Sequence, residues 1–126
     1  MTTPLHIASE NGHIDAMELL IGAGADINKK DEYEWTPLHE ASWESHIDAM
    51  QLLIDANADV NAKNKYGCTS LHHASEMGHT AAIQLLIGAG ADVNAKNNVG
   101  STPLQWASYE GRIDVVQLLR DHGANK

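Results

Sequence analysis

The chain has 126 residues, of which 43% are hydrophobic and 20% charged, values that are typical of a folded protein and exclude wholesale disorder. Its net charge of −9 lies in one half, because residues 1–63 carry 12 acidic and 3 basic side chains whereas residues 64–126 carry 5 of each. An acidic surface of this kind argues against nucleic acid and anionic membranes as partners, and it favours a protein with a basic patch.

The N-terminal residues and the cysteine content bear on the compartment. No apolar stretch approaches the roughly 20 residues needed to span a bilayer, and the N-terminus lacks the pattern of a secretory signal. Cys68 is the only cysteine, so an intrachain disulfide is impossible, which suits a reducing compartment. We therefore expect a cytoplasmic or nuclear protein that is not secreted.

One four-residue motif recurs along the chain at a spacing of 33 residues. Its copies are Thr3-Pro4-Leu5-His6, Thr36-Pro37-Leu38-His39, Thr69-Ser70-Leu71-His72 and Thr102-Pro103-Leu104-Gln105. A fixed period of this size is typical of stacked supersecondary units rather than of a conventional globular core. The sequence therefore predicts a single domain over residues 1–126, with repeats at about 1–30, 31–63, 64–96 and 97–126.

Each repeat is predicted to form two short helices. In the second repeat Thr36 is a candidate N-cap and Pro37 fits the first helical position, so we expect a helix over about 36–44. A glycine, such as Gly12 in the first repeat, then ends this helix, and apolar residues at helical spacing mark the second one. Another glycine, or Asn57 in the second repeat, follows the second helix, where a left-handed C-cap is expected.

The second and fourth repeats depart from the shared pattern. In the second repeat Glu34, Ser45 and Asn57 all occupy positions where neighbouring repeats carry glycine. The fourth repeat has Arg120 where the others have isoleucine. A polar residue there suits a terminal unit that faces water.

The combined pattern resembles the ankyrin repeat. Thr-Pro-Leu-His-x-Ala is followed by Gly-His, by a Leu-Leu pair and by Gly-Ala-Asp-Val-Asn, and the match runs over the whole chain. The resemblance implies an all-α solenoid with short β-hairpin fingers between helix pairs, each a β-turn or a hairpin, at about 28–35, 61–68 and 94–101. It also implies a concave face lined by fingers and first helices. Members of this family are non-enzymatic scaffolds for protein–protein interaction, and we expect a monomer.

The eight histidines raise the question of a metal site. His6, His39 and His72 form one column of the repeat. A zinc site needs three or four ligands that converge on one point, whereas a repeated column spreads them along the array. We therefore expect structural histidines and no metal, cofactor or catalytic residue. A nucleophilic role for Cys68 is disfavoured as well, since the neighbouring His72 belongs to the structural column.

The six aromatic residues are the strongest clue to function. None lies in a repeating apolar column, and all fall on fingers or first helices, where the ankyrin resemblance implies partner contacts. Tyrosine and tryptophan are enriched in binding hot spots, and the acidic side chains of the second repeat suit a Lys- or Arg-bearing ligand. The predicted partner-binding residues are Glu32, Tyr33, Glu34, Trp35, Glu40, Trp43, Glu44, Tyr66, His73, Met77, Trp106 and Tyr109.

Two interpretations of the array stay open from the sequence. In the first, the concave face binds another protein or a peptide through an aromatic and acidic patch centred on the second repeat. Replacing Trp35 and Trp43 by alanine would then remove binding and leave stability nearly intact. In the second, the chain is a structural spacer, or an engineered or model repeat protein, without a specific partner.

Overall fold

The computed structural model describes residues 1–125, which contain eight α-helices and no β-strand. The helices are α1 (Pro4–Asn11), α2 (Ile14–Gly22), α3 (Pro37–Trp43), α4 (Ile47–Asp55), α5 (Ser70–Met77), α6 (Thr80–Gly88), α7 (Pro103–Tyr109) and α8 (Ile113–Asp121). No helix in this part of the chain is long and apolar enough to cross a bilayer.

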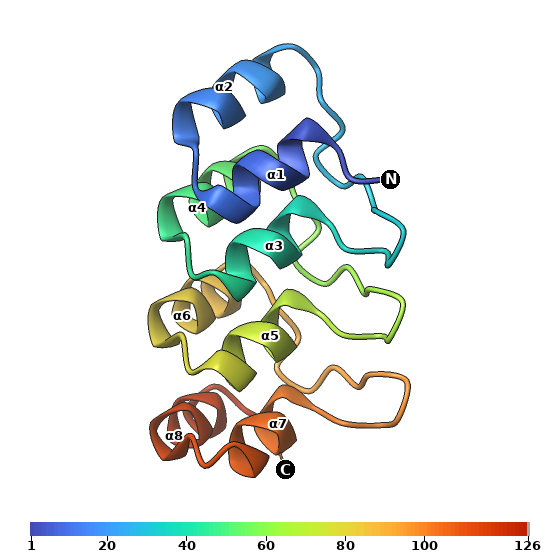
Figure 1. Cartoon of the computed structure of the whole chain (residues 1–126). Coiled ribbons are helices and arrows are strands. Elements are labelled where there is room, and N and C mark those ends of the chain that lie inside the picture. The colour runs from blue at the N-terminus through green and yellow to red at the C-terminus, as the bar shows by residue number, and fades with distance from the viewer. Residues whose placement is uncertain (126) are drawn as a thin grey trace.

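The helices form four consecutive pairs, here called repeats 1 to 4, which stack into an elongated array (Figure 1). The first helices α1, α3, α5 and α7 lie in one layer, and α2, α4, α6 and α8 lie in a second. The loops that lead from one pair to the next, called fingers below, project on the same side of the array. Each first helix contacts the first helix of the next repeat, so the predicted all-helical solenoid is confirmed.

The repeated four-residue motif begins each first helix with a reciprocal pair of hydrogen bonds. In repeat 2 the Thr36 hydroxyl accepts from the backbone N–H of His39 at 3.3 Å, and His39 Nδ1 accepts from the backbone N–H of Thr36 at 3.0 Å. This capping box satisfies two backbone donors that the helix itself cannot use. In repeat 4 the Gln105 side chain accepts from the backbone N–H of Thr102 at 2.9 Å, so glutamine has the same capping role there as histidine in the other repeats.

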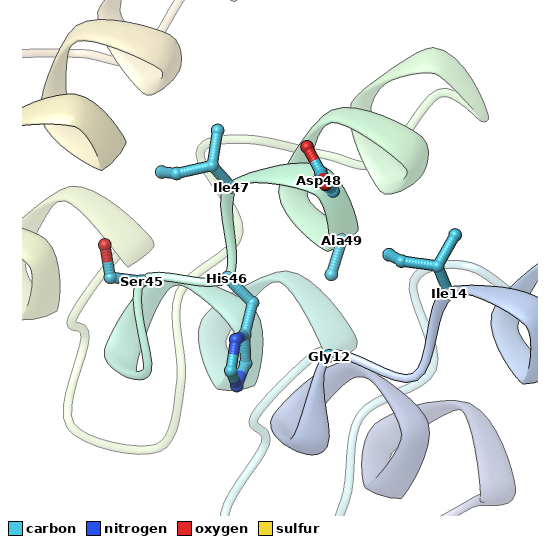
Figure 2. Close-up of a pocket in the computed structure, with 7 residues that line it drawn as sticks. All are labelled: Gly12, Ile14, Ser45, His46, Ile47, Asp48 and Ala49. Carbon is cyan, nitrogen blue, oxygen red and sulfur yellow. The ribbon is translucent and has the colours of Figure 1, made fainter.

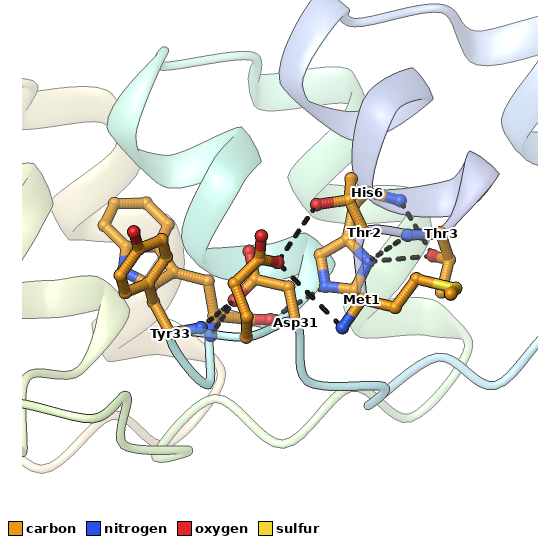
Figure 3. Close-up of polar contacts among 8 residues, drawn as sticks. Met1, Thr2, Thr3, His6, Asp31 and Tyr33 are labelled. Carbon is orange, nitrogen blue, oxygen red and sulfur yellow. Dashed lines mark hydrogen bonds and ion pairs between the residues drawn. The ribbon is translucent and has the colours of Figure 1, made fainter.

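The other nitrogen of each of these histidines joins two repeats. Because Nδ1 accepts a hydrogen bond, Nε2 carries the proton and donates it to a carbonyl oxygen of the next finger. These bonds run from His6 to Trp35 at 2.7 Å, from His39 to Cys68 at 3.0 Å and from His72 to Ser101 at 2.9 Å. Figure 3 shows His6 between Thr3 and the finger that carries Asp31 and Tyr33. The prediction that this column is structural is confirmed.

The fingers are turns and not two-stranded hairpins, which is the first of the two forms that the family resemblance implied. Each is a tight turn closed by two backbone hydrogen bonds, which in the first finger run from Asp31 N–H to the Trp35 carbonyl oxygen and from Glu34 N–H to the Asp31 carbonyl oxygen, both at 2.9 Å. Neighbouring fingers are joined by one further bond, as between Lys65 N–H and the Tyr33 carbonyl oxygen at 2.9 Å. A single bond per pair of fingers does not make a ladder, so no strand forms within residues 1–125.

The core runs along the seam between the two helix layers. Alanine at one position of every first helix (Ala8, Ala41, Ala74 and Ala107) is buried, so adjacent first helices approach closely. Leucine, isoleucine and methionine side chains fill the space below them, and the fully buried ones include Leu5, Met17, Leu38, Met50, Leu53, Leu71, Ile83, Leu86, Leu104 and Leu119. The hydrophobic burial that stabilises the array is therefore shared between neighbouring repeats.

Repeat 2 keeps the backbone of its neighbours without their glycines. Glu34, Ser45 and Asn57 have φ angles of 62°, 58° and 72°, in the left-handed region that glycine adopts freely. At the position equivalent to Ser45, Gly12 has φ 66°, and a Cβ added to Gly12 would lie 2.9 Å from His46 Nδ1. The stack therefore imposes this conformation whatever the residue, and repeat 2 adopts it at a cost in stability.

Candidate protein-binding groove

A hollow of about 310 Å³ lies between repeats 1 and 2, where a finger meets two first helices. Its walls come from α1, from the finger between α2 and α3, and from the exposed face of α3 with its C-cap. Residues 40, 43 and 44 share a helix face because they are three and four apart, and residue 10 occupies the same repeat position as residue 43. The lining residues are Glu10, Asp31, Tyr33, Trp35, Glu40, Trp43 and Glu44, and this hollow is called the groove below.

The two tryptophans of the groove are held by ring contacts with His73 of α5. Trp35 stacks on His73 with 4.5 Å between ring centroids and 23° between planes, and Trp43 meets His73 edge-on at 5.3 Å and 70°. Trp35 and Trp43 also contact each other edge-to-face at 5.8 Å. Offset and edge-to-face pairs of this kind stabilise aromatic rings beyond their area of contact. Both indoles are half-buried, so their orientation is fixed before any ligand arrives.

His73, one of the predicted binding residues, is buried and does not line the groove. Only 5% of its surface is exposed, because the ring lies beneath Trp35, Trp43 and Trp106. Its Nε2 accepts a hydrogen bond from Asn64 Nδ2 at 3.2 Å, and its Nδ1 has no partner within residues 1–125. Burial, with smaller effects of His39 and His72, lowers the pKa of His73 from 6.5 to about 3, so the ring is neutral and serves as a platform for the indoles.

No basic side chain within residues 1–125 forms an ion pair with the carboxylates of the groove. Burial, followed by the charges of Glu10, Asp31 and Glu44, raises the pKa of Glu40 from 4.5 to about 7. The only ion pair within residues 1–125 joins the Met1 amine to Glu32, outside the groove. Asp31 is partly compensated, because its carboxylate accepts hydrogen bonds from the backbone N–H groups of Tyr33 and Trp35, both at 2.9 Å (Figure 3).

Glu32 and Glu34 lie on the same finger but do not line the groove. The Glu32 carboxylate lies 3.9 Å from the Met1 amine and 3.5 Å from the Thr2 hydroxyl. Glu34 occupies the left-handed turn position, and its side chain is exposed. Both belong to the surroundings of the groove rather than to its walls.

Four further predicted residues lie on repeats 3 and 4, and none of them lines the groove. Tyr66 is 55% exposed on the next finger, and Tyr109 is 89% exposed at the end of α7. Trp106 packs edge-on against His72 at 5.2 Å, and Met77 is half-buried at the end of α5. The structure therefore gathers Tyr33, Trp35, Glu40, Trp43 and Glu44 and leaves these four apart.

Two lining residues, Glu10 and Asp31, are absent from the predicted set. The repeat spacing carried a signal for Glu10, because that residue holds in repeat 1 the position that Trp43 holds in repeat 2. Asp31 lies at the start of a finger, where the sequence indicates a turn-forming residue and gives no sign that its carboxylate also lines the groove.

A second hollow, of about 350 Å³, lies where the helix pairs of repeats 1 and 2 turn (Figure 2). His46 lies over Gly12, and Asp48 points away from His46, so the two side chains do not form an acid–base pair. Within residues 1–125 no three histidine, cysteine, aspartate or glutamate side chains are placed to hold a metal ion. The chemistry that stands out is therefore that of the groove.

Comparison with known proteins agrees with the architecture. A family model described as ankyrin repeats (3 copies) matches residues 1–64 and 58–126, which together cover the whole chain. A search of curated proteins found no match. Ankyrin repeats generally mediate protein–protein interaction, and the family is typically non-enzymatic. The chain, with its 33-residue period and its four stacked helix pairs, belongs to the ankyrin-repeat family.

Proposed function

We propose that this chain is a non-enzymatic protein-binding module that takes a basic segment of a partner protein into the groove. One observation carries the proposal: half-buried indoles and carboxylates line the same groove, and no basic side chain of residues 1–125 forms an ion pair with these carboxylates. A cation entering the groove would contact the ring faces and offset the repulsion among the carboxylates at the same time.

The aromatic rings favour tight docking because they are already ordered. Trp35 and Trp43 are fixed against His73, so a partner would not have to immobilise them. Binding to a preorganised surface costs less conformational entropy than binding to a mobile one. Tyr33, which is 52% exposed at the rim, adds a further aromatic surface.

Backbone strain adds support for this location. Three non-glycine residues with left-handed φ angles all fall in repeat 2, which supplies most of the groove. Such strain persists where surrounding structure enforces it, and it concentrates at functional sites.

The test must separate binding from stability. Alanine at positions 35 and 43 is a poor choice, because both indoles cover the buried His73 and their loss would destabilise the array by about 2 kcal/mol or more. Glu40→Gln is sharper, because at pH 8, above the Glu40 pKa of about 7, it removes one charge of the groove and keeps the shape of the side chain. Glu18→Gln, at an exposed position on α2, is the matched control.

The experiment is a selection of short random peptides on the full chain, followed by affinity measurements. We expect the selected peptides to be enriched in lysine or arginine over the starting pool. We also expect Glu40→Gln to weaken them about tenfold, whereas Glu18→Gln leaves their affinity unchanged. Selected peptides without basic residues, or equal losses in the two variants, would show the proposal to be wrong.

A further inference from the structure

Building on the proposed function, we infer that the side chain entering the groove is an arginine rather than a lysine or a methylated lysine. All three are cations and all three are attracted to ring faces, so charge and aromaticity alone do not distinguish them. The distinction follows from the N–H donors that the carboxylates need and from the shape of the cation.

Glu40 is the first reason for this preference. Its carboxylate is half-buried, and no group within residues 1–125 donates a hydrogen bond to its side chain. An ionised carboxylate only accepts hydrogen bonds, and a partly buried one is stabilised by donors that replace lost water. A trimethylated lysine offers no N–H group and would cover Glu40 without satisfying it.

The placement of the other carboxylates is the second reason. Glu10 approaches the groove from α1, Asp31 from the finger, and Glu44 from the C-cap of α3. Acceptors arranged on three elements suit a cation whose donors point in several fixed directions. Arginine has five N–H donors in a rigid planar fork, whereas lysine presents three on a compact ammonium group.

The indoles are the third reason. Trp35 has His73 stacked against it, yet its ring also lines the groove together with Trp43. A guanidinium group is planar and weakly hydrated, so it can lie flat on an indole while its in-plane N–H groups reach carboxylates at the edge of the ring. An ammonium group holds its water more tightly and would lose more hydration free energy on entering the same site.

The inference is tested with four synthetic peptide pools that differ at one central position and contain no other basic residue. This position holds arginine, lysine, trimethyllysine or citrulline, which is a neutral analogue of arginine, and the flanking residues are randomised identically. Binding of each pool to the full chain is measured by the bound fraction at equal concentration. We expect the arginine pool to bind about tenfold more than the lysine pool and more strongly still than the other two.

Each outcome has a distinct meaning. Arginine and lysine pools that bind equally, or a trimethyllysine pool that binds best, would overturn the arginine preference but leave the basic-segment proposal intact. A citrulline pool that binds as well as the cationic pools would overturn both. In Glu40→Gln we expect the ratio of arginine to lysine binding to fall about threefold or more, whereas Glu18→Gln should keep it. An unchanged ratio in Glu40→Gln would show that Glu40 does not select the guanidinium, and would contradict the inference.

Discussion

Glu40 and His73 occupy the same position in successive repeats, yet their pKa values move in opposite directions. Burial disfavours the charged form of each group, so the pKa of Glu40 rises to about 7 whereas that of His73 falls to about 3. The nearby charges act in the same sense as burial in both cases, since Glu40 faces three acidic residues and His73 faces two histidines. These two residues therefore link the stability of the chain to pH.

Glu40 should destabilise the fold as the pH rises. Its pKa in the folded chain is about 7, above the ordinary value of 4.5, so the folded state releases this proton later than the unfolded state does. The free energy of unfolding therefore falls between pH 4.5 and about 7 as Glu40 ionises at a net cost to the folded state. Thermal melts should show Glu40→Gln stabilised relative to the original chain at pH 8, and less so at pH 4.5. A stabilisation that is equal at both pH values would contradict the assigned environment of Glu40.

His73 should destabilise the fold as the pH falls. Its pKa in the folded chain is about 3, below the ordinary value of 6.5. Between pH 6.5 and about 3 the unfolded state therefore binds a proton that the folded state does not bind. This lowers the free energy of unfolding by about 3 kcal/mol at pH 4.5. His73→Phe keeps a flat ring beneath the indoles, and denaturant unfolding should show it losing less stability between pH 7 and pH 4.5. His39, whose pKa burial lowers to about 4, stays present in both proteins as an internal reference.

Among the structural elements, repeat 2 has the backbone conformation of its neighbours but carries non-glycine residues at three positions with left-handed φ angles. Its finger, the turn between its two helices and the residue after the C-cap of α4 all require left-handed φ angles, and these positions hold Glu34, Ser45 and Asn57. Asparagine tolerates this conformation better than glutamate or serine. Substitution by glycine should therefore change the free energy of unfolding by different amounts at the three positions.

Glycine at positions 34 and 45 should stabilise the array. The strain of a left-handed side chain is relieved, and the greater freedom of glycine in the unfolded chain offsets part of the gain. We expect Glu34→Gly and Ser45→Gly each to raise the unfolding free energy by about 0.5–1 kcal/mol, and Asn57→Gly to change it less. Urea unfolding of the three variants tests this order. A loss of stability in Ser45→Gly would mean that its hydroxyl makes a favourable contact that outweighs the strain.

Across the whole molecule, the acidic charge is gathered in the half that holds the groove. Residues 1–63 carry 12 acidic and 3 basic side chains, and Lys30 and Lys63 donate hydrogen bonds to finger carbonyls at 2.8 and 3.0 Å instead of pairing with acids. Like charges left unpaired oppose the folded state and attract a cationic partner, and both effects are screened by salt.

Salt should therefore act on folding and binding in opposite directions. Raising the ionic strength from about 0.05 M to about 0.5 M should increase the melting temperature, because it screens repulsion among the carboxylates. The same change should weaken a basic peptide selected on the groove. Melting curves and affinity titrations on the same samples test the pair of effects. A melting temperature that falls with salt would show that attractive ion pairs outweigh repulsion in the folded chain.

The repeat architecture can be predicted from the amino-acid sequence alone, because the signals for it are local. Threonine and proline at the start of the first helices, and residues able to take left-handed φ angles, each act within a few residues, and the 33-residue period repeats them along the chain. The structural role of the His39 column could be predicted for the same reason, since its capping bond closes over three residues. Consistent local signals repeated four times leave one way to stack the helices.

The set of side chains that forms the groove depends on how neighbouring repeats pack and could not be predicted from the repeat pattern. The repeat pattern predicts His73 to be a surface residue of a first helix, but the indoles from the finger and helix of repeat 2 cover it. Glu10 joins the groove although it lies in another repeat, and Glu32 is drawn to the N-terminus instead. Burial and charge at such positions depend on the volume and direction of side chains from the adjacent repeat. The period of the sequence gives the position of a residue in its own repeat, whereas the packing of two repeats determines what surrounds it.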